Sequence, residues 1–351
     1  MAPRYSAQHL QVFACTLLVR AGMPPDMAGD VADVLLEGDL LGHDTHGLQL
    51  LAPYLAEVEK GTMRVAGSYE VVNERPACAI WDGRRLPGPW LCLRALEQAI
   101  AQARQFGTGT IVIRRSHHIA CLAAYLKRAT DQGFVMQLLC SDPNGASVAP
   151  FGGTRAVFTP DPLAFGFPTG GDPVLIDISA SLTTNGMTNR LHRQGKRFAY
   201  PWLIDAEGNA TDDPGVLFDK PPGTILPLGG LEAGHKGYGL ALIVEALTGG
   251  LAGFGRSDAK EGWGATVFVQ IIDPDAFGSR KDFERQAAWI ARACQENPPR
   301  AGVGSVKLPG QRGLQRRREQ LQSGVQLSPE ITPALAGWAE KLQVALPVPM
   351  D

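Results

Sequence analysis

The sequence lacks the usual signals of a membrane, secreted or nucleic-acid-binding protein. Its 351 residues contain no apolar run long enough to span a bilayer and no basic-then-apolar leader at the N-terminus. There are 33 basic and 35 acidic residues, and a net charge of −2 gives no reason to expect nucleic acid or an anionic membrane as a partner. We therefore expect a cytoplasmic protein whose partner is a small-molecule substrate.

Paired cysteines are also missing, since the 6 cysteines are scattered and no C-x-x-C occurs. This spacing argues against a disulfide framework or a zinc ribbon and indicates a reducing compartment. Cys121 and Cys140 lie in apolar stretches, where a free cysteine behaves as a small hydrophobic residue. We interpret both as core residues rather than nucleophiles.

Three common functional motifs are absent as well. No G-x-G-x-x-G follows a predicted strand, so a standard dinucleotide-binding fold is not supported. No Walker A lysine loop and no G-x-S-x-G nucleophile motif occur either. Function therefore has to be read from less familiar motifs.

Alternating helical and strand patterns predict an α/β protein. Apolar spacing predicts helices over 6–21, 26–41 and 90–106, and a short one after Pro53. Strands are predicted at 77–81, 110–113 and 134–140, and a helix at 119–130 before the last of these predicts a parallel strand pair with a crossover helix. Later strands are predicted near 156–158, 164–167, 174–178 and 266–272, and later helices at 236–251, 283–294 and 316–323, where Arg316-Arg317-Arg318 reads as a solvated face.

The segment Thr45-His46-Gly47 lies between two predicted helices and places a hydroxyl beside an imidazole. An imidazole titrates near neutral pH and can give or take a proton during a reaction. The alternative is a loop histidine that caps the preceding helix.

Two further histidine motifs follow. His117 and His118 end a predicted buried strand, so one ring can face a crevice while the other satisfies a backbone group. Adjacent residues rarely bind one ion together, and we predict no metal. His235-Lys236 sits among glycines at a helix start, which suits a phosphate, although a plain surface turn has the same composition.

Taken in order, the motifs resemble the malate/L-lactate dehydrogenase family of NAD(P)-dependent oxidoreductases, which includes ureidoglycolate dehydrogenase, diketogulonate reductase and cyclic ketimine reductase relatives. The likeness covers roughly residues 6 to 330. It rests on Thr45-His46-Gly47, Ser116-His117-His118, Pro150-Phe151-Gly152-Gly153, residues 159–167, Ile176-Asp177-Ile178, Trp202-Leu203-Ile204-Asp205, Pro227-Leu228-Gly229-Gly230 and His235-Lys236-Gly237-Tyr238-Gly239.

The resemblance implies a fold and a reaction. The fold is an α/β cofactor-binding domain of non-Rossmann type with a mixed sheet, expected over 69–309, and a helical lobe built from 1–68 and 310–351. The reaction moves a hydride between nicotinamide, from NAD or NADP, and a small 2-oxo or 2-hydroxy acid-like substrate. The family is typically a homodimer with its site near the subunit interface.

The resemblance also implies roles for particular residues. His46, paired with Thr45, is the implied proton donor, and His118 takes that role in other members. Implied cofactor contacts are Ser116, His117, His118, Ser141, Asp177, Ile178, Ser179, His235, Lys236, Gly310 and Gln311. Implied substrate contacts are Thr159, Asn185 and Gly186, together with position 50.

Three positions depart from the family pattern near the implied substrate. Leu50 replaces an arginine that would clamp a carboxylate, Met187 replaces a charged residue, and Asp161 replaces an asparagine. We therefore expect a substrate other than malate or lactate, with Arg190, Arg193 or Arg197 as candidate replacement cations. Two alternatives stay open, an NADPH-dependent cyclic ketimine reductase and a non-catalytic nucleotide-binding protein.

Overall fold

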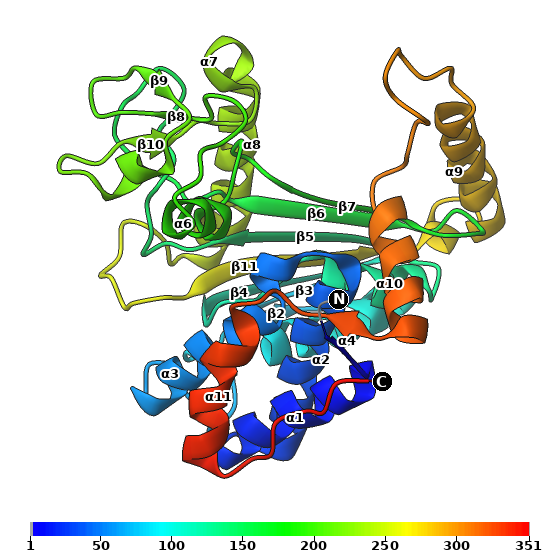
Figure 1. Ribbon diagram of the computed structural model, residues 1–351. Coiled ribbons are helices and arrows are strands. Elements are labelled where there is room, and N and C mark those ends of the chain that lie inside the picture. Colours follow the sequence, from blue (N-terminus) through cyan, green and yellow to red (C-terminus); the bar gives the residue numbers. More distant parts are fainter. Residues whose placement is uncertain (1–2, 351) are drawn as a thin grey trace.

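A mixed sheet forms the centre of the molecule in the computed structural model, which describes residues 3–350 (Figure 1). Its seven strands follow the order β2-β3-β4-β11-β5-β6-β7. The strands are β2 (Glu70–Arg75), β3 (Cys78–Asp82), β4 (Thr108–Ser116), β11 (Ala265–Ile272), β5 (Val135–Ser141), β6 (Pro162–Phe167) and β7 (Val174–Ser179). This arrangement confirms the predicted α/β class with a mixed sheet.

One predicted pairing is wrong. We expected β4 and β5 to be parallel neighbours, but β11 lies between them and is antiparallel to both. The parallel neighbours are β3 and β4, joined by α4 (Gly88–Phe106). The local sequence pattern identifies β4 and β5 as strands, but it does not show that β11 lies between them. That position depends on a segment more than a hundred residues later in the chain.

Helices cover both faces of the sheet. On one face lie α4, α5 (Ala123–Thr130) and α2 (Pro25–Leu41), and on the other lies α8 (His235–Glu245), continued by a π-turn over Ala246–Gly250. Val244 and Ala252 pack there against Val112, Leu139 and Phe268 of the sheet. Beside α8 stand α6 (Asn185–Arg193), η3 (Pro214–Phe218), α7 (Gly230–Ala233) and a small antiparallel sheet of β10 (Thr224–Ile225), β8 (Leu203–Ile204) and β9 (Ala210–Thr211).

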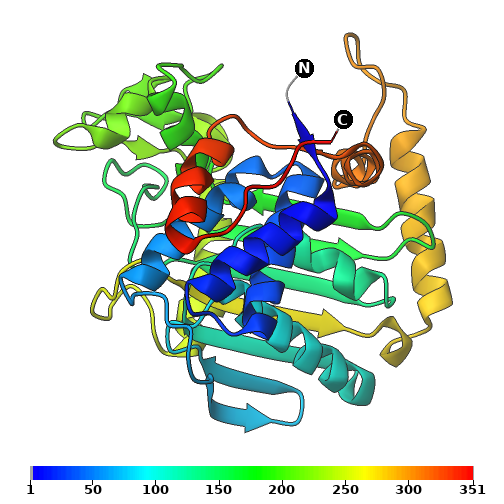
Figure 2. The same ribbon diagram turned by 60° about the horizontal axis from the view of Figure 1, so that its bottom comes forward.

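The two ends of the chain pack together. Helices α1 (Ala7–Arg20) and α3 (Leu51–Glu59) contact α11 (Ile331–Leu342), and α10 (Gln311–Ser323) contacts α2. Strand β1 (Arg4–Tyr5) pairs with β12 (Val325–Gln326). Figures 1 and 2 show these blue, orange and red elements side by side. Their apolar side chains join those of the sheet in one continuous core, so the division into two lobes stays a prediction.

Several expected boundaries shift. Helix α5 begins at Ala123, four residues later than predicted, and Phe158 forms only an isolated bridge with Val148. The helix predicted over 236–251 is confirmed as α8 together with the π-turn that continues it. Helices α6 and α11 were not predicted, whereas η5 (Pro274–Ala276) leads into the expected α9 (Arg280–Gln295). No helix within 3–350 has both the length and the apolar character needed to cross a bilayer.

The arginine run on α10 is not simply a solvated face. Arg316 donates to Asp44 at 3.1 Å, Arg317 to Glu37 at 2.7 Å, and Arg318 to Asp172 at 2.9 Å. The first two ion pairs join α10 to α2 and to the turn that follows it. The sequence suggested solvation because it could not show which carboxylates face the helix.

Candidate active site

The turn that carries His46 is seated on a buried carboxylate. Helix α2 ends at Gly42 in the left-handed conformation, and the chain continues as η1 (Asp44–His46) and η2 (Leu48–Leu50). The Leu48 N–H donates to Asp39 Oδ2 at 2.6 Å. A Cβ on Gly47 would lie 2.4 Å from the same oxygen, so only glycine fits there. The Asp39 side chain therefore sets where the backbone places His46.

His46 is the centre of a small cluster of functional groups. Its Nδ1 lies 2.9 Å from Thr45 Oγ1, and its ring stacks on that of His118 with centroids 5.9 Å apart. A Cβ on Gly186, at the start of α6, would lie 3.5 Å from Thr45 Cβ. The fold thus brings Thr45, His46, His118 and the Asn185-Gly186 turn together, from three separate segments.

His118 is held by donors on its Nδ1. The Tyr54 hydroxyl lies 2.8 Å from this nitrogen and 3.1 Å from the His118 carbonyl oxygen, and the Ala120 N–H donates to Nδ1 at 3.3 Å. Trp263 packs against the other side of the ring at 4.6 Å. The Ala120 N–H can only donate, so its contact with Nδ1 favours the neutral tautomer of His118 with the hydrogen on Nε2. The single Tyr54 O–H donates either to Nδ1 or to the His118 carbonyl oxygen.

Burial sets the proton affinity of both rings. Burial lowers the pKa of His46 below its usual value, against a smaller raising effect of the Asp177 carboxylate. Burial also holds the pKa of His118 well below its usual value, and the neighbouring His46 lowers it further. His118 therefore stays neutral and can donate a hydrogen bond. His46, whose pKa is lowered less because the Asp177 carboxylate opposes the effect of burial, is the better group for exchanging a proton.

Asp177 lines a cavity that also includes His43, three residues before His46, but none of Thr45, His46 and His118. Its Oδ2 accepts from the Ala123 N–H at 2.8 Å, at the start of α5. The cavity measures about 440 Å³ and is lined by residues of α2, β7 and the start of α10: Leu41, His43, Ala123, Leu175, Ile176, Asp177, Ile178, Lys307, Leu308, Pro309, Gly310, Arg312 and Gly313. Three of the expected cofactor contacts, Asp177, Ile178 and Gly310, therefore share one cavity.

Other expected contacts lie beside Gly310 or at the start of α8. Gly310 starts α10 at φ 82°, and a Cβ there would lie 2.7 Å from Leu175 Cβ. Gln311 instead uses its side-chain oxygen to accept from the Leu308 N–H at 3.1 Å. His235 and Lys236 are exposed at the start of α8. The start of α8 lies beside the end of β7. The Leu228 N–H donates to the Ala180 carbonyl oxygen, and the Gly237 N–H donates to the Leu228 carbonyl oxygen.

Ser141 and Thr159 belong to a second, largely buried polar cluster. Ser141 Oγ donates to Glu245 at 2.6 Å, and Thr159 Oγ1 donates to Asp161 at 2.6 Å. Arg256 reaches Glu245 at 2.8 Å and Asp161 at 3.4 Å. Burial and the Glu245 charge hold the pKa of Asp161 well above its usual value. The two predicted contacts thus lie together, but their hydroxyls already have acceptors.

Ser116 and His117 lie in the interior. Ser116 Oγ donates to the carbonyl oxygen of His117 at 2.7 Å. The His117 ring is fully buried, and neither of its nitrogens has a hydrogen-bond partner within residues 3–350, although Glu57 lies 3.7 Å from Nε2. Burial lowers the pKa of His117 to about 4. His117 therefore faces the core, while His118 faces the cluster with His46.

Two positions that depart from the family pattern, Leu50 and Met187, lie in the segments that carry the cluster, whereas Asp161 belongs to the polar cluster with Arg256. Leu50 packs against the main core, and Met187 is exposed. Of the three candidate cations, Arg190 is half-buried on α6 and donates to Gln49, next to Leu50, at 2.6 Å. Arg193 and Arg197 are exposed, and Arg197 pairs with Asp212 and Asp213. Arg190 is thus the candidate that the fold brings to position 50.

Sequence reasoning missed several residues of the site. Asp39, Tyr54 and Trp263 carry no motif, because each occupies an ordinary place in a helical or loop pattern. Glu245 and Arg256 were missed for the same reason. Only Asp39 offered a signal in the sequence. It lies among the apolar residues of α2, and a carboxylate is rarely buried there unless another group binds it.

Comparison with known proteins identifies the family of the chain. The family model described as malate/L-lactate dehydrogenase matches residues 5–336. An L-lactate dehydrogenase of Cupriavidus necator is 32% identical over 94% of this chain and 95% of that protein. The structure of malate dehydrogenase from Pyrococcus horikoshii matches with a TM-score of 0.88 and 25% identity, covering 98% of this chain and 97% of that one.

A third similarity is to a reductase. The structure of Δ1-piperideine-2-carboxylate reductase from Pseudomonas syringae matches with a TM-score of 0.81 and 26% identity, covering 97% of this chain and 98% of that one. Dehydrogenases of hydroxy and oxo acids make up this group, and a dehydrogenase implies a nicotinamide cofactor. The chain is therefore an oxidoreductase and belongs to the malate/L-lactate dehydrogenase family.

Proposed function

We propose that this protein transfers a hydride between NAD or NADP and a small 2-oxo or 2-hydroxy acid-like substrate other than malate or lactate, with His46 as the proton donor. The observation that carries the proposal is the cluster of Thr45, His46 and His118 beside the cavity lined by Asp177. The alternative within the same chemistry is an NADPH-dependent cyclic ketimine reductase, since an imine needs the same proton and one such reductase shares the fold.

The chain's own residues account for the proton. The bound nicotinamide supplies or accepts the hydride at its C4. His46 in its protonated form gives a proton to the substrate oxygen or nitrogen during reduction, and in its neutral form takes one during oxidation. Thr45 orients the His46 ring through Nδ1. His118 stays neutral, and its Nε2–H is the hydrogen-bond donor that the proposal assigns to this side chain.

The residues present fit a dinucleotide. The cavity has apolar walls from Leu175 and Ile178 and the carboxylate of Asp177. The Asp177 Oδ2 accepts from the Ala123 N–H, and its Oδ1 is available to a ribose hydroxyl. Lys307 and Arg312 line the same cavity and are exposed, which suits phosphate oxygens. Lys236, at the positive end of α8, adds a charge where the next phosphate contact is expected. Ser141, Ser179, His235 and Gln311 remain proposed contacts. Ser116 and His117 were proposed too, but their side chains are fully buried and face the interior.

A homodimer is part of the proposal. Exposed apolar side chains gather on α8 and the turn after it (Leu242, Ile243 and Leu251) and on α9 (Trp289 and Ile290). Patches of this kind usually mark interfaces. We also keep the two-part organisation, with 69–309 binding the cofactor and 1–68 with 310–351 forming a helical lobe that carries His46.

The test of the reaction is absorbance at the reduced-nicotinamide band with 2-oxo acids and cyclic imines, each with NADH and NADPH. We expect turnover of at least one substrate class other than oxaloacetate and pyruvate. Robust turnover of malate or lactate would disprove the substrate assignment. If the cofactor bound but no substrate turned over, the non-catalytic nucleotide-binding alternative would replace the proposal.

Leu50→Arg is expected to raise kcat/KM for malate by about tenfold or more, because a guanidinium beside the site can bind a carboxylate through two charge-assisted hydrogen bonds. A gain of this size corresponds to about 1.4 kcal/mol. The measurement is initial rates of malate oxidation in the variant and the wild type. Leu50→Met, which adds no charge, serves as the control, and an equal gain in that variant would contradict the explanation.

Arg190→Met is expected to raise KM for the physiological class of acid by about 10–100-fold, since a hydrogen bond to a charged group contributes about 1.5–3 kcal/mol. Arg190 is the arginine that reaches position 50 through Gln49. Arg197→Met is the matched control, because Arg197 is exposed and paired elsewhere. Steady-state kinetics in which both variants behave alike would rule out Arg190 as the substrate cation.

A further inference from the structure

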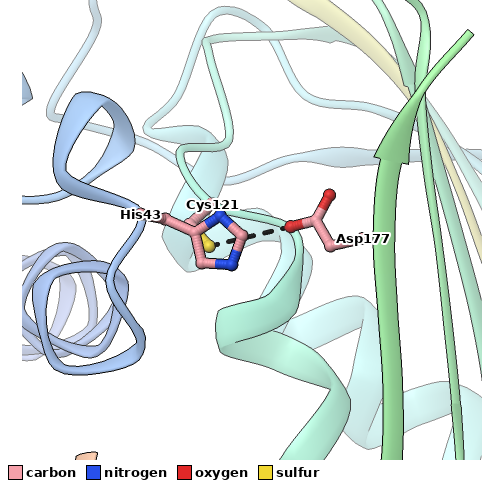
Figure 3. Close-up of side chains that lie close together, drawn as sticks. All are labelled: His43, Cys121 and Asp177. Atoms are coloured by element: carbon pink, nitrogen blue, oxygen red, sulfur yellow. Dashed lines mark hydrogen bonds between the residues drawn. The ribbon is translucent and has the colours of Figure 1, made fainter. Parts of the chain in front are cut away.

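Three potential metal ligands from distant parts of the chain meet beside the candidate active site. They are His43, just after α2, Cys121, just before α5, and Asp177 of β7 (Figure 3). One ligand atom from each lies within 4.8 Å of the others, and Cys121 Sγ is 3.8 Å from Asp177 Oδ2. No short sequence motif joins these residues. Our expectation that the protein binds no metal was based on motif spacing and did not consider this cluster.

The donor set suits zinc. Zn²⁺ binds thiolate sulfur, imidazole nitrogen and carboxylate oxygen at about 2.0–2.3 Å, which places the ligand atoms of a tetrahedral site roughly 3.5 Å apart. The separations in the structure, 3.8 Å between Cys121 Sγ and Asp177 Oδ2 and at most 4.8 Å for the set, are longer than this, so a side chain has to rotate inward when the ion binds. Hard cations such as Mg²⁺ disfavour a thiolate, so the sulfur selects a thiophilic ion.

The surroundings hold two ligands and leave the third free to move. Asp177 is fixed by the Ala123 N–H, and Cys121 is buried at the start of the same helix. The His43 ring is half-buried and makes no side-chain hydrogen bond within residues 3–350, so it can turn toward the other two without losing a partner. His43 and Asp177 also line the 440 Å³ cavity, which leaves room for water as a fourth ligand.

We propose that His43, Cys121 and Asp177 form a reversible Zn²⁺ site whose occupation excludes the dinucleotide. Binding replaces the proton of the Cys121 thiol by the metal, so one proton is released and no redox change occurs. The exclusion rests on the proposed function, in which the Asp177 carboxylate binds the cofactor. Lys307 and Arg312 line the same cavity, and their positive charges oppose permanent retention of a cation.

The metal site is tested without cofactor, by equilibrium dialysis with Zn²⁺ and by the absorption spectrum of the protein with Co²⁺ in its place. We expect one Zn²⁺ per chain and a near-ultraviolet charge-transfer band from a sulfur ligand in the Co²⁺ form. Cys121→Ser should remove the band, and His43→Gln, at a half-buried position, should weaken Zn²⁺ binding by about tenfold or more.

Two control variants address adventitious binding. Cys294→Ser and His9→Gln change an exposed thiol and an exposed imidazole outside the cluster, and both should keep the band and the stoichiometry. Circular dichroism confirms that each variant is folded. A sulfur band that survives Cys121→Ser, or Zn²⁺ binding that is unchanged in His43→Gln, would overturn the site.

The exclusion is tested by titrating NADH and NADPH fluorescence with and without Zn²⁺. We expect the apparent Kd of the cofactor to rise in proportion to Zn²⁺ in the wild type, with at most a tenth of this effect in His43→Gln. If Zn²⁺ loads the site without changing the cofactor Kd, exclusion is wrong. If neither cofactor binds in the absence of Zn²⁺, the proposed function fails while the metal site stands.

Discussion

His46→Gln is expected to lower kcat for reduction by about 10²–10⁴-fold, the range that a positioned acid or base contributes. Glutamine keeps a polar group of similar reach but cannot give a proton near neutral pH. Because the Gly47 and Asp39 packing places the backbone, the variant should fold as the wild type does. Steady-state rates with the identified substrate measure the loss, and His9→Gln, an exposed helix position, is the matched control.

The pH profile separates proton donation from a positioning role. Burial lowers the pKa of His46, so kcat/KM for reduction should fall as pH rises through a pKa below about 6.5, whereas kcat/KM for oxidation should rise over the same range. Both dependences should disappear in His46→Gln. A variant that keeps the wild-type profile at a lower rate would show that another group carries the proton.

His118→Gln provides the comparison between the two histidines. A smaller loss in kcat is expected, with an unchanged pH profile, because the pKa of His118 lies well below its usual value and its Nδ1 is occupied by Tyr54. The opposite pattern, in which His118→Gln loses the pH dependence and His46→Gln keeps it, would transfer the proton-donor role to His118.

The second large effect is on stability. Burial raises the pKa of Asp39 to about 7, even though the Leu48 N–H donates to its carboxylate. The native state therefore keeps a proton that the unfolded chain releases near pH 4, and the resulting stabilisation is lost as pH rises toward and through 7. Between pH 5 and pH 8 the free energy of unfolding should fall by about 2–3 kcal/mol from this group, at about 1.36 kcal/mol per pKa unit.

Asp39→Asn should remove that decline. The amide oxygen can still accept from Leu48, and no charge forms in the interior at high pH. Urea unfolding between pH 5 and pH 8, at one protein concentration, measures the slope. Asp26→Asn, at an exposed position of the same helix, should keep the wild-type slope. An equal decline in Asp39→Asn would show that another group is responsible.

Much of the local structure could be predicted from the sequence. Ser6 caps α1, Gly42 ends α2 and Gly107 ends α4, in agreement with the helix ranges predicted from the sequence. The motif around Thr45 and His46 was found because a hydroxyl, an imidazole and a glycine are adjacent in the chain. Such features depend only on neighbours, so a single sequence contains them.

The composition of the site required the tertiary structure. The insertion of β11 between β4 and β5, the Tyr54 hydroxyl on His118, and the carboxylate beneath Gly47 all join residues far apart in the chain. The same is true of His43, Cys121 and Asp177. Amino-acid order by itself determined the elements, their ends and the proton-handling motif. Long-range packing alone decided which groups surround that motif, because burial and charge act through space and not along the chain.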